Sequence, residues 1–142
     1  MEIKITMICK EIWQAELITK TDTNDGTLTF NGEVLTMEQI KMISSLPKEI
    51  CYENIYVTHS IGDNYLRTKD DFKRLCKIAP KDIKYIFFGH THEKVIYKCN
   101  NKIVINPGSI TKGRRGFDRG YVILNGENIK FINLEAVLWT LL

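Results

Sequence analysis

The sequence lacks any long apolar run. A membrane-spanning helix needs roughly 20 consecutive apolar residues, and no segment of the 142-residue chain approaches that length. Residues 1–20 carry charges at Glu2, Lys4, Lys10 and Glu11, so they do not contain the hydrophobic region of a secretory signal. We therefore expect no membrane association and a cytoplasmic location.

Closely paired cysteines are lacking as well. The four cysteines lie far apart along the chain, at Cys9, Cys51, Cys76 and Cys99. Zinc ribbons and dithiol redox motifs place two cysteines within a few residues of each other, so this spacing argues against both. Nothing in the sequence indicates the oxidising compartment in which disulfides persist. We expect the cysteines to be reduced.

Clusters of positive charge are few. The formal net charge is +3, and most lysines stand singly along the chain. A protein dedicated to nucleic acid usually gathers its basic residues on one face or in one stretch, so nucleic acid is not an expected partner. The most basic stretch is 112–119, which is where we expect an anionic ligand to bind.

Length and composition predict one α/β domain over residues 1–142. Hydrophobic residues make up 44% and charged residues 26%, the balance of an ordinary globular protein. Capping residues and apolar spacing predict helices at 11–18, 36–47 and 68–79. Short apolar runs and turn residues predict strands at 2–8, 27–30, 55–58, 83–88, 94–98, 103–105, 121–124 and 128–132. The apolar residues 136–142 fit a strand, a short helix or an interface.

The only three histidines all follow predicted apolar strands. His59 follows Ile-Tyr-Val-Thr, and His90 and His92 follow Tyr-Ile-Phe-Phe-Gly. Open α/β sheets bind ligands in loops just beyond strand ends, and neutral imidazole is a ligand for divalent transition metals. Side chains two residues apart point to opposite faces of an extended strand. We therefore expect Gly89 to supply the backbone freedom for a tight turn in which both rings converge. The alternative is that each histidine is an ordinary surface or hydrogen-bonding residue.

A series of short motifs runs through residues 36–124. In chain order these are Leu-Pro-Lys-Glu, His-Ser after a strand, Gly-His-Thr-His, a hairpin, Asn-Pro-Gly-Ser, and an arginine-containing loop before Tyr-Val-Ile-Leu. Each motif is weak alone, but the ordered set resembles the C-terminal part of the small bacterial and archaeal calcineurin-like metallophosphoesterases. The resemblance implies a partial or truncated four-layer α/β/β/α metallophosphoesterase sandwich. Residues 36–142 would be its C-terminal half and residues 1–35 a divergent N-terminal segment.

The resemblance also implies a metal site. His59 and His90 would bind one divalent cation (Mn²⁺, Zn²⁺, Fe²⁺ or Ni²⁺) and His92 a second. Two cations about 4 Å apart would polarise a water and the phosphoryl group of a phosphodiester or nucleotide-like substrate. Arg114 and Arg115 are candidate substrate ligands through charge-assisted hydrogen bonds, with a solvated loop as the equal alternative. The turn at 106–109 would support the site.

The N-terminal motifs of that family are not found in this sequence. Family members carry Asp-x-His, then Gly-Asp, then Gly-Asn-His-Asp, which supply the bridging carboxylate, further ligands and an acid for the leaving group. Residues 1–35 contain no histidine, and their only aspartates are Asp22 and Asp25. The one Gly-Asp pair, Gly62-Asp63, follows the first histidine. Three neutral imidazoles can hold one cation, whereas two cations about 4 Å apart need an anion between them.

Four explanations stay open. In the first, the chain is half of a split enzyme that another polypeptide or a second copy completes. In the second, it is a decayed member that binds a metal or partner without catalysis. In the last two, it is a member with a rebuilt site or a fragment of a longer product. Asp22, Asp25 and Asp63 are the candidates for a rebuilt site. The enzyme hypothesis predicts metal-dependent phosphoester hydrolysis once the site is complete. The alternative is an inactive metal-binding or protein-interaction scaffold, which the apolar tail and open sheet edges favour, with a homo-oligomer as the simplest cover.

Overall fold

The computed structural model describes residues 2–5, 29–30, 33–34, 36–45, 47–62, 64–110 and 112–135. The chain divides into two compact units. The main unit comprises Met1–Ile8 and Glu49–Leu142, and the inserted unit comprises Cys9–Lys48. All three histidines belong to the main unit.

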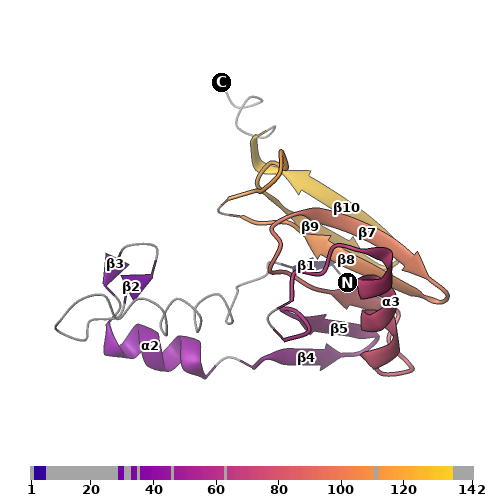
Figure 1. Ribbon diagram of the computed structural model, residues 1–142, viewed down its shortest axis with the longest axis horizontal. Helices are drawn as coiled ribbons and strands as arrows, with labels where there is room; N and C mark the ends of the chain where they lie inside the picture. Colours follow the sequence, from indigo (N-terminus) through magenta and orange to yellow (C-terminus); the bar gives the residue numbers. More distant parts are fainter. Residues whose placement is uncertain are drawn as a thin grey trace. The chain divides into compact units, whose positions relative to one another are not determined.

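A five-stranded sheet forms the centre of the main unit (Figure 1). Its strands, in the order β4-β5-β6-β8-β7, are β4 (Glu49–Tyr52), β5 (Ile55–Thr58), β6 (Tyr85–Phe87), β8 (Lys102–Pro107) and β7 (Lys94–Cys99). The three middle strands are parallel, and an antiparallel hairpin partner flanks them on each side. The sequence predicted all of these strands except β4, and β6 is shorter than expected.

A second sheet contains three antiparallel strands in the order β1-β9-β10. Strands β9 (Gly120–Asn125) and β10 (Asn128–Asn133) form the predicted hairpin. Strand β1 (Glu2–Ile5) pairs with β9 from the far end of the chain, so that Ile3 lies opposite Leu124. The sequence predicted each strand but not this long-range pairing.

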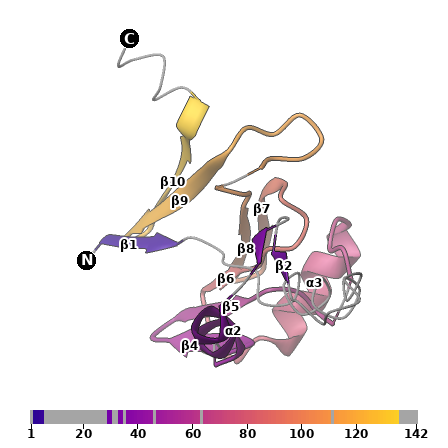
Figure 2. The ribbon, with the colours of Figure 1, turned by 90° about the vertical axis from the view of Figure 1, so that its left-hand side faces the viewer.

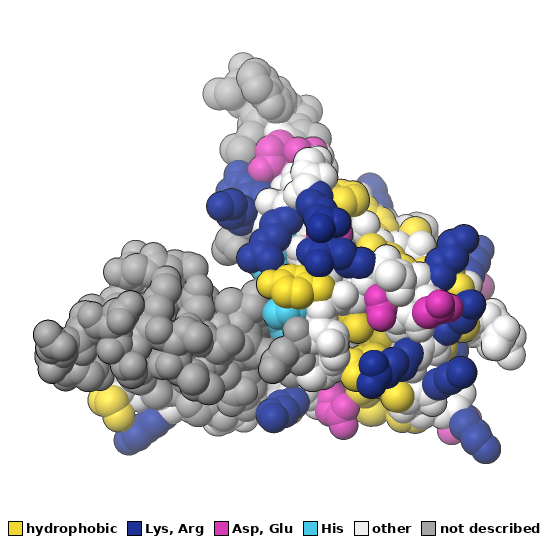
Figure 3. Space-filling model, viewed as in Figure 1, with side chains coloured by type: hydrophobic (Ala, Val, Ile, Leu, Met, Phe, Trp, Pro, Cys, Tyr) yellow, Lys and Arg dark blue, Asp and Glu magenta, His cyan; other side chains and the backbone are white. Residues whose placement is uncertain are grey.

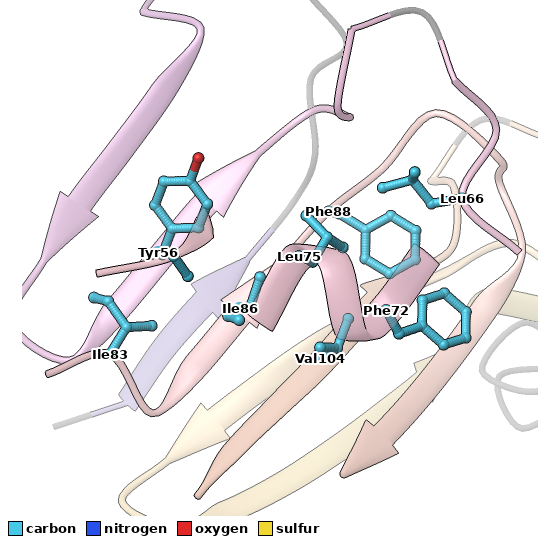
Figure 4. Packing of buried hydrophobic residues seen from close by; sticks show 9 residues of the cluster. Tyr56, Leu66, Phe72, Leu75, Ile83, Ile86, Phe88 and Val104 are labelled. Carbon is cyan, nitrogen blue, oxygen red and sulfur yellow. The ribbon is translucent and has the colours of Figure 1, made fainter. Parts of the chain in front are cut away.

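Alternation along β6 divides the core of the main unit into two clusters. Successive side chains of a strand point to opposite faces of its sheet. Tyr85 and Phe87 therefore pack toward β9, in a cluster completed by Ile55, Ile105, Val122 and Leu124. Ile86 and Phe88 point the other way, as Figure 4 shows, and meet Tyr56, Leu66, Phe72, Leu75, Ala79, Ile83 and Val104. A fully buried Phe, Leu or Ile side chain stabilises the fold by roughly 1.5–3 kcal/mol.

Helix α3 (Lys69–Ile78) covers the outer face of the five-stranded sheet and matches its prediction. Its N-cap is Thr68, whose hydroxyl oxygen accepts a hydrogen bond from the Asp71 backbone N–H at 3.2 Å. The Asp71 carboxylate accepts the Thr68 N–H at 2.8 Å in return, which completes a capping box. Pro80 follows the C-cap, where its ring prevents further helix. The buried face of the helix carries Phe72 and Leu75.

The main unit is therefore layered as helix, sheet and sheet. Figure 2 shows α3, the five-stranded sheet and the β1-β9-β10 sheet in succession. This arrangement confirms the predicted α/β class and corresponds to three of the four layers expected for the sandwich.

The described elements of the inserted unit are α2 (Met37–Ser44) and a short hairpin of β2 (Thr29–Phe30) and β3 (Glu33–Val34). A capping box opens α2 as predicted: the Gln39 N–H donates to Thr36 Oγ1 at 3.2 Å, and Thr36 N–H to Gln39 Oε1 at 2.9 Å. The predicted helix at 11–18 and the apolar segment 136–142 lie outside the described residues. None of the described helices is long and apolar enough to cross a membrane.

Candidate metal site

The parallel strands of the central sheet bring the histidine loops to one edge. His59 follows β5 directly, and the loop with His90 and His92 follows the neighbouring strand β6. The Gly89 N–H donates to the His59 carbonyl oxygen at 2.9 Å and joins the two loops. Parallel strands place their carboxyl ends at the same edge, which is where ligands bind to open α/β sheets.

A very tight turn presents His90. The Thr91 N–H donates to the Gly89 carbonyl oxygen at 2.8 Å, and His90 between them has φ of 67°. This pattern is that of a γ-turn with positive φ, a strained form. His92 has φ of 60°. The prediction that Gly89 supplies the backbone freedom is wrong, because the two histidines themselves take the left-handed conformations and Gly89 does not.

The buried side chain of Asn106 holds this turn in place. Its amide nitrogen donates to the Gly89 carbonyl oxygen at 3.0 Å and to Thr91 Oγ1 at 2.9 Å. Its amide oxygen accepts the Gly108 N–H at 2.9 Å. These bonds satisfy both ends of a fully buried amide and offset the strain of the turn. The predicted turn at 106–109 begins later than expected, because β8 continues through Pro107 and only Gly108 has positive φ.

His59 and His90 face each other through ring nitrogens. His59 Nε2 lies 2.9 Å from His90 Nδ1, so one nitrogen donates a proton and the other accepts it. Burial, followed by the charges of His90 and His92, lowers the pKa of His59 to about 4. His59 is therefore neutral at physiological pH, the form in which imidazole binds metals. Its other nitrogen, Nδ1, is buried and has no hydrogen-bond partner among the described residues.

The tautomer of His92 is fixed by the backbone. Its Nδ1 lies 3.0 Å from the carbonyl oxygen of Lys112, and a carbonyl only accepts, so Nδ1 carries the proton. The lone pair of His92 is then on Nε2. Histidine ligands in metal proteins are commonly oriented by this kind of bond from the other ring nitrogen. Burial and the positive charge of Arg114 lower the pKa of His92, which favours the neutral ring.

A buried carboxylate next to the histidines was missed at the sequence level. Glu93 Oε1 accepts a hydrogen bond from Arg67 Nε at 3.0 Å and lies 2.9 Å from Arg67 Nη2. Arg115 Nε lies 3.4 Å from the same oxygen. The Arg67 guanidinium lies 4.6 Å from the centre of the Tyr65 ring, which stacks on His90 at 4.2 Å. Glu93 thus anchors both chain segments beside the turn. Its position directly after His92 was the only signal available in the sequence.

The two candidate substrate ligands differ in their surroundings. The Arg114 N–H donates to the His92 carbonyl oxygen at 3.3 Å, and the charge of Arg114 acts on the His92 ring. The Arg115 guanidinium forms an ion pair with Glu93. Both side chains are exposed. In Figure 3 a histidine comes to the surface beside a group of lysine and arginine side chains, which gives this edge a positive potential that favours anions.

The donor set fits one cation better than two. Nitrogen ligands of a tetrahedral cation are each about 2.0–2.1 Å from it and therefore about 3.3 Å apart. The 2.9 Å between His59 Nε2 and His90 Nδ1 is close to that spacing. Within the described part of the chain, however, no three His, Cys, Asp or Glu side chains are gathered closely enough to hold a metal ion. Asp22, Asp25 and Asp63, the candidates for a rebuilt site, lie outside the described residues.

Fold and site together define an α/β sandwich with histidines at the carboxyl edge of a parallel sheet. The family model described as the calcineurin-like phosphoesterase superfamily domain matches residues 24–128. The chain therefore belongs to the calcineurin-like phosphoesterase superfamily. No curated protein matches the chain at a significant level.

Solved structures show the same fold. A metallophosphoesterase from Sphaerobacter thermophilus is 16% identical with a TM-score of 0.50, and the match covers 70% of this chain and 53% of that one. A conserved protein of Streptococcus pneumoniae, described as a predicted phosphoesterase, is 19% identical with a TM-score of 0.50, over 63% of this chain and 56% of that one. The chain thus spans a little over half the length of these proteins.

Proposed function

We propose that this chain binds a divalent cation through His59 and His90, offers His92 to a second cation once a bridging carboxylate is supplied, and takes part in phosphoester hydrolysis. The observation that carries the proposal is the 2.9 Å approach of His59 Nε2 to His90 Nδ1 in neutral, buried surroundings. The superfamily is divalent-metal dependent, which supports the same reading. Mn²⁺ is the first ion to test, with Zn²⁺, Fe²⁺ and Ni²⁺ as alternatives.

The chain's own residues would bind and orient the substrate. A bound cation would supply Lewis-acid polarisation of a phosphoryl oxygen. Arg114, exposed beside His92, would bind a phosphate oxygen through its guanidinium. Glu93 would hold Arg67 and Arg115, and through Tyr65 it would limit rotation of the His90 ring. We infer a phosphodiester or nucleotide-like substrate, because Arg115 is shared with Glu93 and Arg114 alone suits a phosphate of low charge.

Hydrolysis needs a carboxylate that can bridge two cations, and Glu93, the carboxylate beside the histidines, is paired with Arg67 and Arg115. We infer that the bridging carboxylate comes from a second copy of the chain, another polypeptide, a further part of a longer product, or one of Asp22, Asp25 and Asp63. The second candidate function is a protein that binds one cation without turnover. The arrangement of Glu93 favours this candidate, because this buried carboxylate beside the histidines is already paired with two arginines.

The test combines metal content with activity. The purified chain is loaded with Mn²⁺ or Zn²⁺, its metal is measured by elemental analysis, and hydrolysis of bis-p-nitrophenyl phosphate is followed. Two ions per chain with turnover would support the enzyme. One ion without turnover would support the binding protein, and no ion would refute both.

Variants of His90 sharpen this test. We expect His90→Ala to abolish tight metal binding while the fold is retained. His90→Gly removes the same ring but suits the positive φ, so it separates loss of the ligand from backbone strain. Asn100→Ala, at an exposed hairpin residue with φ of 53°, is the matched control for strain alone. Metal binding by His90→Ala equal to that of Asn100→Ala would contradict the proposal.

A further inference from the structure

Helix α3 and strand β7 run side by side, with a repeating contact between them. The Phe72 ring on α3 lies 5.3 Å from the Tyr97 ring on β7. Four residues along a helix advance by about 6 Å, and two residues along a strand by about 6.6 Å. The next pair along this contact is therefore Cys76 and Cys99.

The structure brings these two cysteines together as the repeat requires. Both cysteines are half-buried, and the Cys99 side chain contributes to the raised pKa of the Cys76 thiol, so the two side chains are neighbours. Cys76 also packs against the same core cluster as Tyr97. The two cysteines line one pocket of about 360 Å³ on the helix-covered side of the sheet. Neither thiol is used by the histidine site.

The pocket beside the thiols is basic. Besides the two cysteines and Tyr97, its walls include Lys73, Lys77 and Lys98. Lys73 also pairs with Asp70 at 3.1 Å, which offsets part of its charge. An anionic ligand would be attracted to such a cavity, and the attraction would weaken as salt is added.

We propose that Cys76 and Cys99 form a redox-active thiol pair, which an anionic low-molecular-weight disulfide of the glutathione type oxidises to a disulfide between α3 and β7. The lysines recognise the carboxylates of the oxidant, and the thiols exchange with its S–S bond. The sequence predicts a cytoplasmic protein, where the pair rests in the reduced form.

The exchange begins at Cys99. Burial, together with the hydrogen bond to Cys99 and its charge, raises the pKa of Cys76 to about 12, so Cys76 stays protonated at first. Cys99 loses its proton and attacks one sulfur of the oxidant, which forms a mixed disulfide and expels one thiol. Cys76, held beside the mixed disulfide, then loses its proton as it attacks the Cys99 sulfur and expels the second thiol. Two protein thiols lose two electrons and two protons, and the oxidant is reduced to two thiols.

The test uses the full chain carrying Cys9→Ser and Cys51→Ser, so that only the proposed pair remains. After incubation with glutathione disulfide, we expect a product about 2 Da lighter than the reduced chain, with Cys76 and Cys99 joined in one cross-linked peptide. Its melting temperature should rise on the order of 5 °C, because the cross-link restricts the unfolded chain. Stable mixed disulfides at both cysteines, or no reaction, would overturn the proposal.

Single variants check the order of attack. Cys76→Ser should stop at the mixed disulfide on Cys99, whereas Cys99→Ser should react more slowly, because burial, the largest cause, still raises the pKa of the remaining Cys76 thiol. If Cys76→Ser fails to fold, trapping the mixed disulfide early in the reaction of the two-cysteine chain gives the same information. Faster reaction at Cys76 than at Cys99 would refute the assigned order.

The role of the lysines is tested separately with Lys77→Gln and Lys98→Gln combined. We expect the rate with glutathione disulfide to fall several-fold and the rate with uncharged hydroxyethyl disulfide to stay unchanged. Replacing Lys130, an exposed lysine of β10 outside this pocket, by Gln is the matched control. Equal losses with both oxidants would show that the lysines do not select an anion.

Discussion

The main unit and the inserted unit differ in the sequence separation of the residues that make their described contacts. In the main unit β1 pairs with β9, and β6 pairs with β8, so each sheet joins segments that are far apart in sequence. In the inserted unit the described contacts are local: Thr29 lies opposite Val34, and Thr36 caps its own helix. Long-range burial makes stability cooperative, whereas local capping stabilises single elements. The main unit is therefore suited to hold a site with fixed geometry.

The largest difference should follow from removing a buried ring in the main unit. Phe87 has no exposed surface and packs between the two sheets, so we expect Phe87→Ala to lower the free energy of unfolding by about 3–5 kcal/mol. Met42→Ala in α2 should change it by less than about 0.5 kcal/mol, because Met42 is 60% exposed. Urea unfolding measures both, and equal losses would contradict the contrast between the units.

Acid should also act mainly on the main unit. The pKa of His59 is about 4 in the folded chain and about 6.5 when unfolded, so between these values only the unfolded state takes up the proton. In metal-free protein the free energy of unfolding should fall by at most roughly 3 kcal/mol as the pH drops from 6.5 to 4. His59→Asn should remove this slope when urea unfolding is compared between pH 7.5 and 4.5. An unchanged slope in the variant would refute the assignment.

The smallest effects concern the two capping boxes. Thr68→Ala should lower the free energy of unfolding of the main unit by about 1 kcal/mol, because α3 is part of its core. Thr36→Ala should weaken α2 to a similar degree without moving the main transition. Hydrogen exchange of the α2 amides, measured beside the urea midpoint, separates the two outcomes. A shift of the main transition in Thr36→Ala would show that the units unfold together.

Local signals in the sequence were enough for most elements of the main unit. Strand β5, helix α3 with its Thr68 cap and the hairpin of β9 and β10 were predicted because turn residues and apolar spacing lie within each segment. Strand β4 was missed because it has no buried face: all four of its residues are exposed, so its sequence does not show the alternation of apolar and polar residues that marks a half-buried strand. The pairing of β1 with β9 depends on tertiary packing, which a single sequence does not display.

The candidate site was predicted in outline and not in detail. Motif order indicated all three histidines, and the structure brings His59 and His90 together. The contact of Arg67 with Glu93 joins residues far apart in sequence, so no local pattern indicated it. The source of the turn was also misassigned, because glycine is the usual residue at positive φ, and His90 and His92 occupy that conformation instead. Their metal roles, and the division at residue 36, stay predictions.

The conformations of His90 and His92 imply a trade-off between stability and chemistry. A left-handed backbone costs a non-glycine residue roughly 1–2 kcal/mol relative to glycine. This loop carries two such residues, His90 and His92, on either side of the buried Thr91. Glycine at either position would relax the loop and delete an imidazole. Random mutation selected only for thermal stability should therefore drift toward glycine at these two positions. A lineage that retains histidine at both would show that selection has acted on the rings and not on the fold.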